Sequence, residues 1–169
     1  KDSGTFDYFT EAVVGKARAS RQDYTASEDD DELVEGVSKD LNALGYFGFA
    51  YYEANQNKLK ALAVDSGRGA VLPSRQTVEK AQYEPLSRPL FIYVNARSVQ
   101  LKPAVRRFVD FYIQRAPTLV SSVGYIPLPA EGYRLSYIYF NRGKVGTVFE
   151  GKSQIGLTIG QLLRRQAKF

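Results

Sequence analysis

Four small or polar residues, Asp2, Ser3, Gly4 and Thr5, stand directly before aromatic and apolar residues at helical spacing. Side-chain oxygens at such a position accept hydrogen bonds from the first N–H groups of a helix and cap it. The same groups also suit an oxyanion, because a helix N-terminus carries partial positive charge and glycine permits close approach. The spacing alone is compatible with a plain helix cap and with an anion-binding site.

Residue types that usually perform catalysis are scarce. The chain has no Cys and no His, which excludes disulfides, thiolate chemistry and Ser-His-Asp or Cys-His catalysis within it. The sequence forces no two carboxylates together. We therefore expect a protein that is not an enzyme, with no catalytic residue, no cofactor and no metal site, and a hydrolase is the enzyme alternative.

Three other stretches each allow a functional and a structural interpretation. The acidic run Glu28–Glu32 would suggest a cation site, but it lacks the alternating ligands and central glycine of a calcium loop and suits the start of a helix. The aromatic residues at 46–52 would stack on bases, yet strand alternation explains them. Residues 67–69, Gly-Arg-Gly, would bind phosphate or form an ordinary loop. We prefer the structural interpretation of each.

The 169 residues suffice for one globular domain, and the net charge of +5 is unevenly distributed. Residues 1–53 carry 5 Lys/Arg against 12 Asp/Glu, and residues 54–169 carry 18 against 6. The basic residues stand singly or in pairs between apolar positions, which favours solvated helix faces and predicts no nucleic-acid partner. The chain lacks Met, so we expect a processed mature protein or a fragment of a longer one.

Helix and strand patterns alternate along the chain, which predicts an α/β fold. Ser27, with Asp30 three residues later, resembles a capping box, and Ser74 is placed to cap a short helix. Pro117 should end a helix whose buried face includes Phe108 and Tyr112. Helices are predicted at 4–14, within 27–40, and at 74–81, 103–117, 118–123, 134–141 and 157–169. Strands are predicted at 44–53, 58–66 and 90–94.

Four stretches, in this order, resemble the periplasmic phosphate-binding proteins of the phosphate ABC transporter, and among them the cyanobacterial-type branch. Residues 2–13, "DSGTFDYFTEAV", look like the phosphate-binding loop and helix start of that family. Residues 28–52 look like the helix-to-strand segment that follows. Residues 85–94, "PLSRPLFIYV", look like the strand that crosses between lobes, and residues 145–165 look like the C-terminal tail of the branch.

The resemblance implies a periplasmic-binding-protein-like (type II) clamshell, of which this chain is a part. Residues 1–88 would form most of the second, ligand-binding lobe, residues 89–97 a hinge crossover, and residues 98–169 a helical portion that returns to the first lobe. The N-terminal half of the family would be absent. We therefore expect exposed apolar surface, and association with that half or self-association.

By the same resemblance, the hydroxyls and amides of Ser3, Gly4 and Thr5 would hold phosphate oxygens. Asp2 would take the role of the family Asp, which accepts a proton from phosphate or orients an Arg, and that Arg would precede Lys1. A buried acceptor would discriminate phosphate from sulfate, which has no proton to offer.

The resemblance also implies a biological role. The protein would capture inorganic phosphate in the periplasm or outside the cell and deliver it to the permease subunits of an ABC importer. The alternative is a secreted clamshell protein that binds another oxyanion, or that serves as a sensor or adhesion module without transport.

Overall fold

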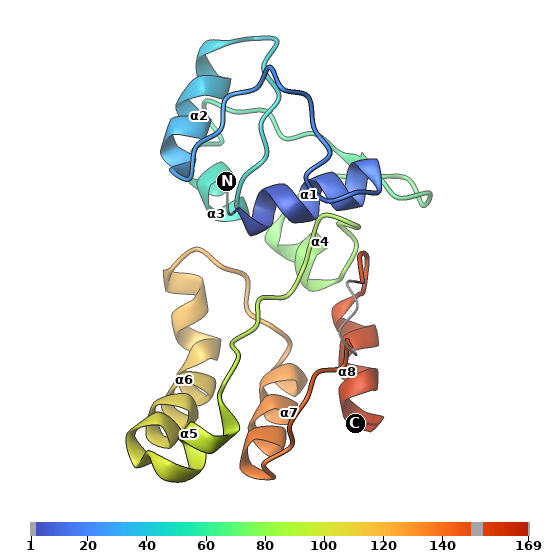
Figure 1. Cartoon of the computed structure of the whole chain (residues 1–169). Coiled ribbons are helices and arrows are strands. Elements are labelled where there is room, and N and C mark those ends of the chain that lie inside the picture. Colours follow the sequence, from blue (N-terminus) through green and yellow to red (C-terminus); the bar gives the residue numbers. More distant parts are fainter. Residues whose placement is uncertain (1–2, 150–153, 169) are drawn as a thin grey trace.

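Helices form most of the regular structure in the computed structural model, which describes residues 3–149 and 154–168 (Figure 1). The helices are α1 (Gly4–Val14), α2 (Asp30–Lys39), α3 (Phe49–Ala54), α4 (Arg75–Glu79), α5 (Ala96–Leu101), α6 (Pro103–Ser122), α7 (Ala130–Asn141) and α8 (Ile159–Lys168). Strands β1 (Val64–Asp65) and β2 (Ala70–Val71) pair antiparallel, with Val64 opposite Val71.

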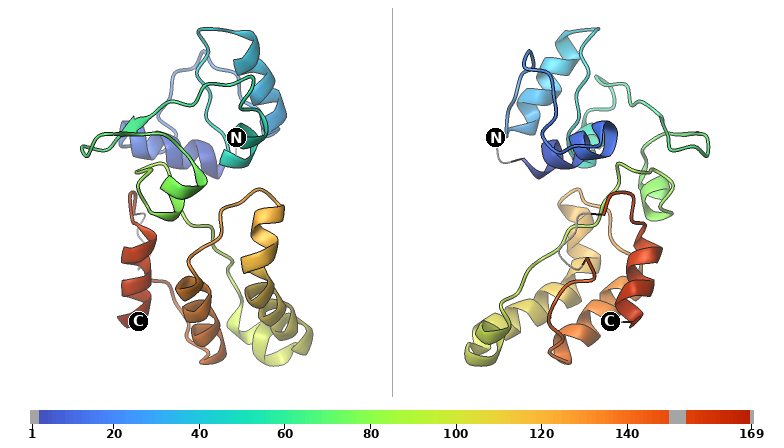
Figure 2. Two further views of the ribbon diagram at one scale, coloured as in Figure 1. Left: turned by 180° about the vertical axis from the view of Figure 1, so that it is seen from behind. Right: turned by 45° about the vertical axis from the view of Figure 1, so that its right-hand side comes forward.

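The elements form two groups joined by an extended stretch (Figures 1 and 2). Helices α1 to α4 and the β1–β2 hairpin lie in one group, here called the N-terminal unit (residues 3–86). Helices α5 to α8 form the C-terminal unit (residues 96–149 and 154–168), in which each helix packs against the next. Residues 87–95, the crossover segment, have no regular secondary structure and link the two units.

Helix α1 confirms the predicted helix at 4–14. The Oγ of Ser3 accepts a hydrogen bond from the Phe6 N–H at 3.2 Å, and Gly15 ends the helix with a φ of 80°. Only glycine adopts this left-handed conformation without a steric cost, which explains the stop. The local sequence therefore determines both ends of α1.

The predicted cap of the second helix is wrong by two residues. Asp29 caps α2 by accepting from the Asp31 N–H at 2.9 Å, whereas Ser27 donates to the Glu32 carboxylate at 2.7 Å. An Asp caps as well as a Ser, so the residue closer to the helix takes this position. The acidic run does lie at the start of the helix, as predicted, with Asp30, Asp31 and Glu32 in the first turn. At α4 the predicted cap Ser74 is confirmed.

Two strand predictions in the N-terminal unit are wrong. Part of the stretch at 44–53 forms α3, in which the aromatic rings of Phe49 and Tyr52 stand one helical turn apart with centroids at 6.0 Å. The stretch at 58–66 is strand only at β1. Alternating aromatic residues favour a strand only where a neighbouring strand accepts the ladder hydrogen bonds, and the described residues pair none with 44–53.

The apolar stretch 90–94, predicted as a strand, is extended but unpaired among the described residues. Its side chains are largely exposed, and Tyr93 reaches 85%. A strand is defined by its hydrogen-bonded neighbour, and this segment has none within the described part of the chain.

In the C-terminal unit, α6 runs through Pro117, so the predicted end there and the separate helix at 118–123 are wrong. A proline removes one helical hydrogen bond, but it does not stop a helix whose flanking residues stay packed, and Ala116 beside it is buried. The inward face is Val109 and Ala116, whereas Phe108 and Tyr112, predicted as buried, are 63% and 43% exposed.

The predicted helices at 134–141 and 157–169 are confirmed as α7 and α8, with different first residues. Gly132 lets α7 approach its neighbours closely, since a Cβ there would stand 3.3 Å from the Cβ of Leu128 and 3.5 Å from a methyl carbon of Leu163. Helix α5 had no predicted counterpart. No helix among the described residues is long and apolar enough to cross a membrane.

The chain leaves an unusually large surface uncovered. Its accessible area is 12096 Å², whereas a compact monomer of 18.9 kDa has about 8,300 Å². The apolar side chains that are buried among the described residues are Val34, Val109, Ala116 and Leu162. This excess agrees with the expectation of exposed apolar surface.

Candidate functional site

The first turn of α1 brings three predicted site residues, Ser3, Gly4 and Thr5, together. Ser3 caps the helix through its side chain and accepts the Asp7 N–H through its carbonyl at 3.0 Å. The N–H groups of Gly4 and Thr5, at the first two helical positions, have no hydrogen-bond partner among the described residues. Orphan N–H groups at a helix start can bind an anion. Asp2, the fourth predicted site residue, lies outside the described residues.

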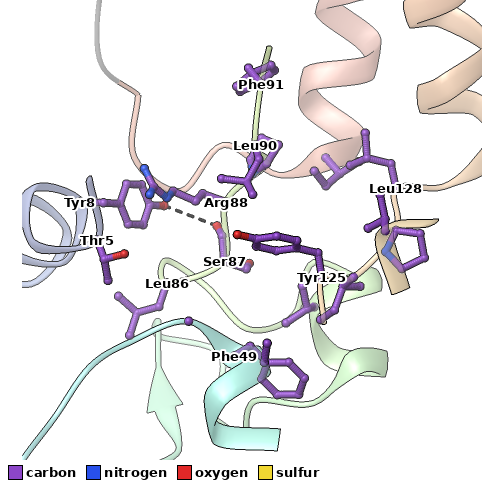
Figure 3. A pocket seen from close by; sticks show the side chains of 18 of the residues that line it. Thr5, Tyr8, Phe49, Leu86, Ser87, Arg88, Leu90, Phe91, Tyr125 and Leu128 are labelled. Atoms are coloured by element: carbon purple, nitrogen blue, oxygen red, sulfur yellow. Dashed lines mark hydrogen bonds between the residues drawn. The ribbon is translucent and has the colours of Figure 1, made fainter. Parts of the chain in front are cut away.

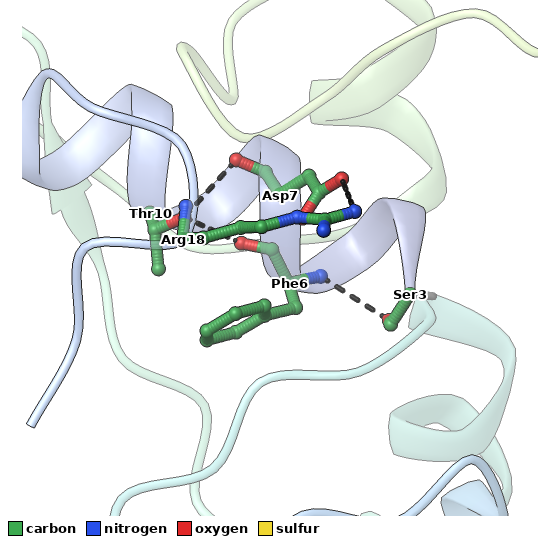
Figure 4. A network of polar contacts seen from close by, with 5 residues as sticks. All are labelled: Ser3, Phe6, Asp7, Thr10 and Arg18. Carbon is green, nitrogen blue, oxygen red and sulfur yellow. Dashed lines mark hydrogen bonds and ion pairs between the residues drawn. The ribbon is translucent and has the colours of Figure 1, made fainter. Parts of the chain in front are cut away.

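A polar network holds the loop after α1 against the helix (Figure 4). Thr10, the buried polar residue of α1, donates from its Oγ1 to the Phe6 carbonyl at 2.8 Å and accepts the Arg18 N–H at 2.7 Å. The Arg18 guanidinium forks onto the Asp7 carboxylate at 2.9 and 3.1 Å. Both contacts return the chain to α1, at Thr10 in its middle and at Asp7 in its first turn.

This network also changes the electrostatics beside the candidate site. Asp7 places a carboxylate in the first turn of α1, where it would repel a bound anion. The hydrogen bonds from Arg18 hold the pKa of the Asp7 carboxyl below its ordinary value, which keeps the pair ionised and its charges matched. The first turn therefore retains the helix dipole with little net charge from this carboxylate.

Tyr8 joins α1 to the crossover segment (Figure 3). Its hydroxyl donates to the Pro85 carbonyl at 2.6 Å, with the Ser87 carbonyl at 3.5 Å. Burial raises the pKa of Tyr8, while the positive charge of Arg88 acts in the opposite direction. The Arg88 guanidinium carbon lies 5.1 Å from the centre of the Tyr8 ring, within cation–π range.

A large open hollow of about 3050 Å³ extends from this region along the crossover segment. Thr5, Tyr8, Ser87 and Arg88 lie on one side of it in Figure 3, and Tyr125 reaches in from the C-terminal unit. This volume suits an open cleft between two units more than a closed ligand pocket, since small-molecule pockets usually have volumes of about 300–1,000 Å³.

The structure supports the structural interpretation of two of the other candidate motifs, Gly-Arg-Gly at 67–69 and the acidic run at 28–32. The strand that explained the aromatic residues at 46–52 is wrong, because Phe49–Ala54 forms α3. The N–H groups of Gly67 and Gly69 both donate to the Asp65 carboxylate, at 2.7 and 3.0 Å, so the Gly-Arg-Gly stretch is a hairpin loop whose glycine donors are occupied. The acidic run starts α2. Among the described residues, no three carboxylates gather where a metal ion would need them.

Sequence reasoning missed Thr10, Arg18 and Arg88 as parts of this region. Thr10 stands within the predicted helix, where a polar residue on the apolar face was an available signal. Arg18 follows that helix closely in the sequence. Arg88 has no such signal, because no local spacing relates it to α1. The contact between α1 and the crossover segment at Tyr8 and Ser87 joins residues 79 positions apart.

Comparisons with known proteins extend these observations. Residues 1–116 match the family model described as a PBP superfamily domain. The chain is 64% identical over 169 residues to Protein SphX of Synechocystis sp., covering 100% of this chain and 50% of that relative. It is 32% identical over 134 residues to the phosphate-binding protein PstS of Staphylococcus haemolyticus, covering 78% of this chain and 40% of that relative.

A solved structure agrees with the family match. The crystal structure of a possible phosphate binding protein from Planctomyces limnophilus superposes with a TM-score of 0.68 at 40% identity, covering 86% of this chain and 52% of that one. The chain thus spans about half the length of the relatives it matches. Because the family model covers well over half of its residues, the chain belongs to the PBP superfamily.

Proposed function

We propose that this chain is the part of a phosphate-binding protein that holds inorganic phosphate at the N-terminus of α1. The observation that carries the proposal is the similarity of most of the chain to proteins whose names describe phosphate binding or possible phosphate binding. The N-terminus of α1 alone would not support the proposal, since such helix ends are common. The N–H groups of Gly4 and Thr5, which have no partner among the described residues, are a chemically suitable place for the anion.

The proposed binding mode uses mainly uncharged donors. The Thr5 hydroxyl and the amides of Gly4 and Thr5 would hold phosphate oxygens at the positive end of the helix. The Ser3 hydroxyl can donate to an oxygen while its lone pair still accepts from Phe6. Asp2 would accept the phosphate proton or orient an Arg, and a buried acceptor of this kind would disfavour sulfate.

The proposal extends to the assembled protein. Residues 1–88 would belong to one lobe, residues 89–97 to the hinge and residues 98–169 to the other lobe. The rest of the protein, which the relatives have in addition, would cover the exposed apolar crossover segment. The loaded protein would deliver phosphate to ABC permease subunits, in the periplasm or outside the cell, without catalysing a reaction.

A titration tests this proposal. The chain would be produced together with the part of the Synechocystis relative that it does not match, and phosphate binding would be measured by calorimetry. We expect saturable binding at micromolar or tighter affinity that excess sulfate does not displace. Tight binding of another oxyanion would favour the alternative ligand, and failure to bind any anion by a folded assembly would refute the proposal.

A further inference from the structure

Arg88 reaches across from the crossover segment to the first turn of α1. If Gly4 carried a Cβ, that atom would stand 3.3 Å from Nη2 of Arg88 and 3.8 Å from Nη1. The guanidinium therefore lies beside the residue that opens the helix, at the proposed position of the ligand. A side chain at Gly4 would compete with it for this space.

Tyr8 holds this arrangement in place. Its ring lies under the Arg88 guanidinium, and its hydroxyl binds the main chain three residues earlier, at Pro85. Within the described part of the chain, Arg88 makes no ion pair with a carboxylate, whereas Arg18 and Arg75 are each paired. The donors of Arg88 are positioned by an aromatic face, which leaves its N–H groups available.

We propose that Arg88 binds phosphate directly, as a charged contact supplied by the crossover segment; this rests on the proposed function of α1. The planar guanidinium presents two parallel donors that match two phosphate oxygens. Because the crossover segment links the two units, a ligand held by both α1 and Arg88 would also fix the N-terminal unit against that segment. Arg88 would then add specificity for a doubly charged oxyanion.

The competing explanation is that Arg88 only packs on Tyr8. The test compares phosphate affinity of Arg88→Gln, Arg88→Lys and a matched control, Arg115→Gln, in the same assembly of chain and unmatched half. Arg115 also lies over an aromatic ring, at 6.0 Å from Phe111, but within α6 and away from α1. Thermal unfolding without phosphate checks that each variant folds.

We expect Arg88→Gln to weaken phosphate binding about tenfold or more, Arg88→Lys to weaken it less, and Arg115→Gln to leave it unchanged. Added NaCl should lower the phosphate affinity of the original protein more steeply than that of the Arg88→Gln variant, because the contact that the variant lacks is charged. If Arg88→Gln matches Arg115→Gln in affinity and salt dependence while the original protein binds phosphate, the role of Arg88 is refuted and the proposed function stands. If the folded original does not bind phosphate, the proposed function itself fails.

Discussion

Helix α1 and the crossover segment are both extensively involved in the candidate site, but they are specified in different ways. Helix α1 has its cap, its stop and its buried hydroxyl within residues 3–18, so its structure follows from neighbouring residues. The crossover segment has an equally clear apolar pattern at 90–94, yet it finds no partner among the described residues. The difference shows that a helix can be completed locally, whereas a strand needs a neighbour.

The largest effect is expected from a charge in the crossover segment. We expect Ile92→Asp to lower the unfolding free energy of the assembled protein by about 3–5 kcal/mol, because a covered apolar strand would bury an unpaired carboxylate. In the chain alone, where Ile92 is 46% exposed, the change should stay within about 0.5 kcal/mol. Urea unfolding of both forms measures the contrast.

The control for this comparison is Gln114→Glu, which adds the same charge to an exposed position of α6. It should be nearly neutral in both forms. An Ile92→Asp assembly as stable as its control would contradict the idea that the other half of the protein covers this segment.

The same contrast explains which predictions succeeded. Helix α1 and the Ser74 cap were predictable because their hydrogen bonds join residues three or four positions apart. The strands predicted at 44–53 and 90–94 failed because their patterns specify a strand only when a distant partner is present. The predicted helix end at Pro117 was wrong for a related reason, because the packing of the buried Ala116 outweighs the helix-breaking tendency of the proline beside it.

The candidate site also combines residues that are neighbours in the sequence with one that only the fold brings to them. Ser3, Gly4 and Thr5 are contiguous, so their types and order suffice to predict a helix start that can hold an anion. Arg88 reaches Gly4 only through the fold, by way of Tyr8. Sequence reasoning therefore finds the local half of this site and misses the part that the crossover segment supplies.

The second prediction separates the two roles of Ser3. Asp caps a helix as well as Ser, so Ser3→Asp should change the unfolding free energy by less than about 0.5 kcal/mol. A carboxylate beside the ligand repels an anion, so phosphate affinity should fall by at least about a hundredfold. Calorimetric titration and urea unfolding of the same assembly measure both quantities.

The matched control is Ser74→Asp, the same substitution at the cap of α4. It should alter neither quantity appreciably. If Ser3→Asp retained full phosphate affinity, the α1 terminus would be a plain cap, and the ligand would have to bind elsewhere.

The third prediction concerns the buried hydroxyl that completes α1. Thr10→Val keeps the shape of the side chain but leaves the Arg18 N–H without its acceptor. We expect a loss of about 1–3 kcal/mol in unfolding free energy. Thr118→Val is the control, because that hydroxyl lies exposed on α6 and only bonds back to the Arg115 carbonyl. Equal losses for the two variants would show that Thr10 adds nothing beyond an ordinary helical threonine.

The smallest effect is expected at the exposed Asp7–Arg18 pair. Asp7→Asn should loosen the loop after α1, and trypsin should cleave after Lys16 and Arg18 roughly twofold faster, because exposed ion pairs contribute little. The pKa of Asp7 is lowered in the folded chain. The contribution of the pair is therefore fully present above the unfolded pKa of about 3.9 and is lost as the pH falls through the lower folded value.

Asp23→Asn is the matched control for this substitution. Asp23 forms a more exposed fork with Arg21, two residues away, so it does not tie the loop to α1. Its removal should leave cleavage after Lys16 unchanged. If the two variants were cleaved at the same rate, the ion pair of Asp7 with Arg18 would not restrain the loop. The Thr10 hydroxyl would then be the contact that holds the loop against α1. A faster cut in Asp7→Asn only would assign the two contacts separate roles: the Thr10 hydroxyl fixes the chain, and the ion pair limits its motion.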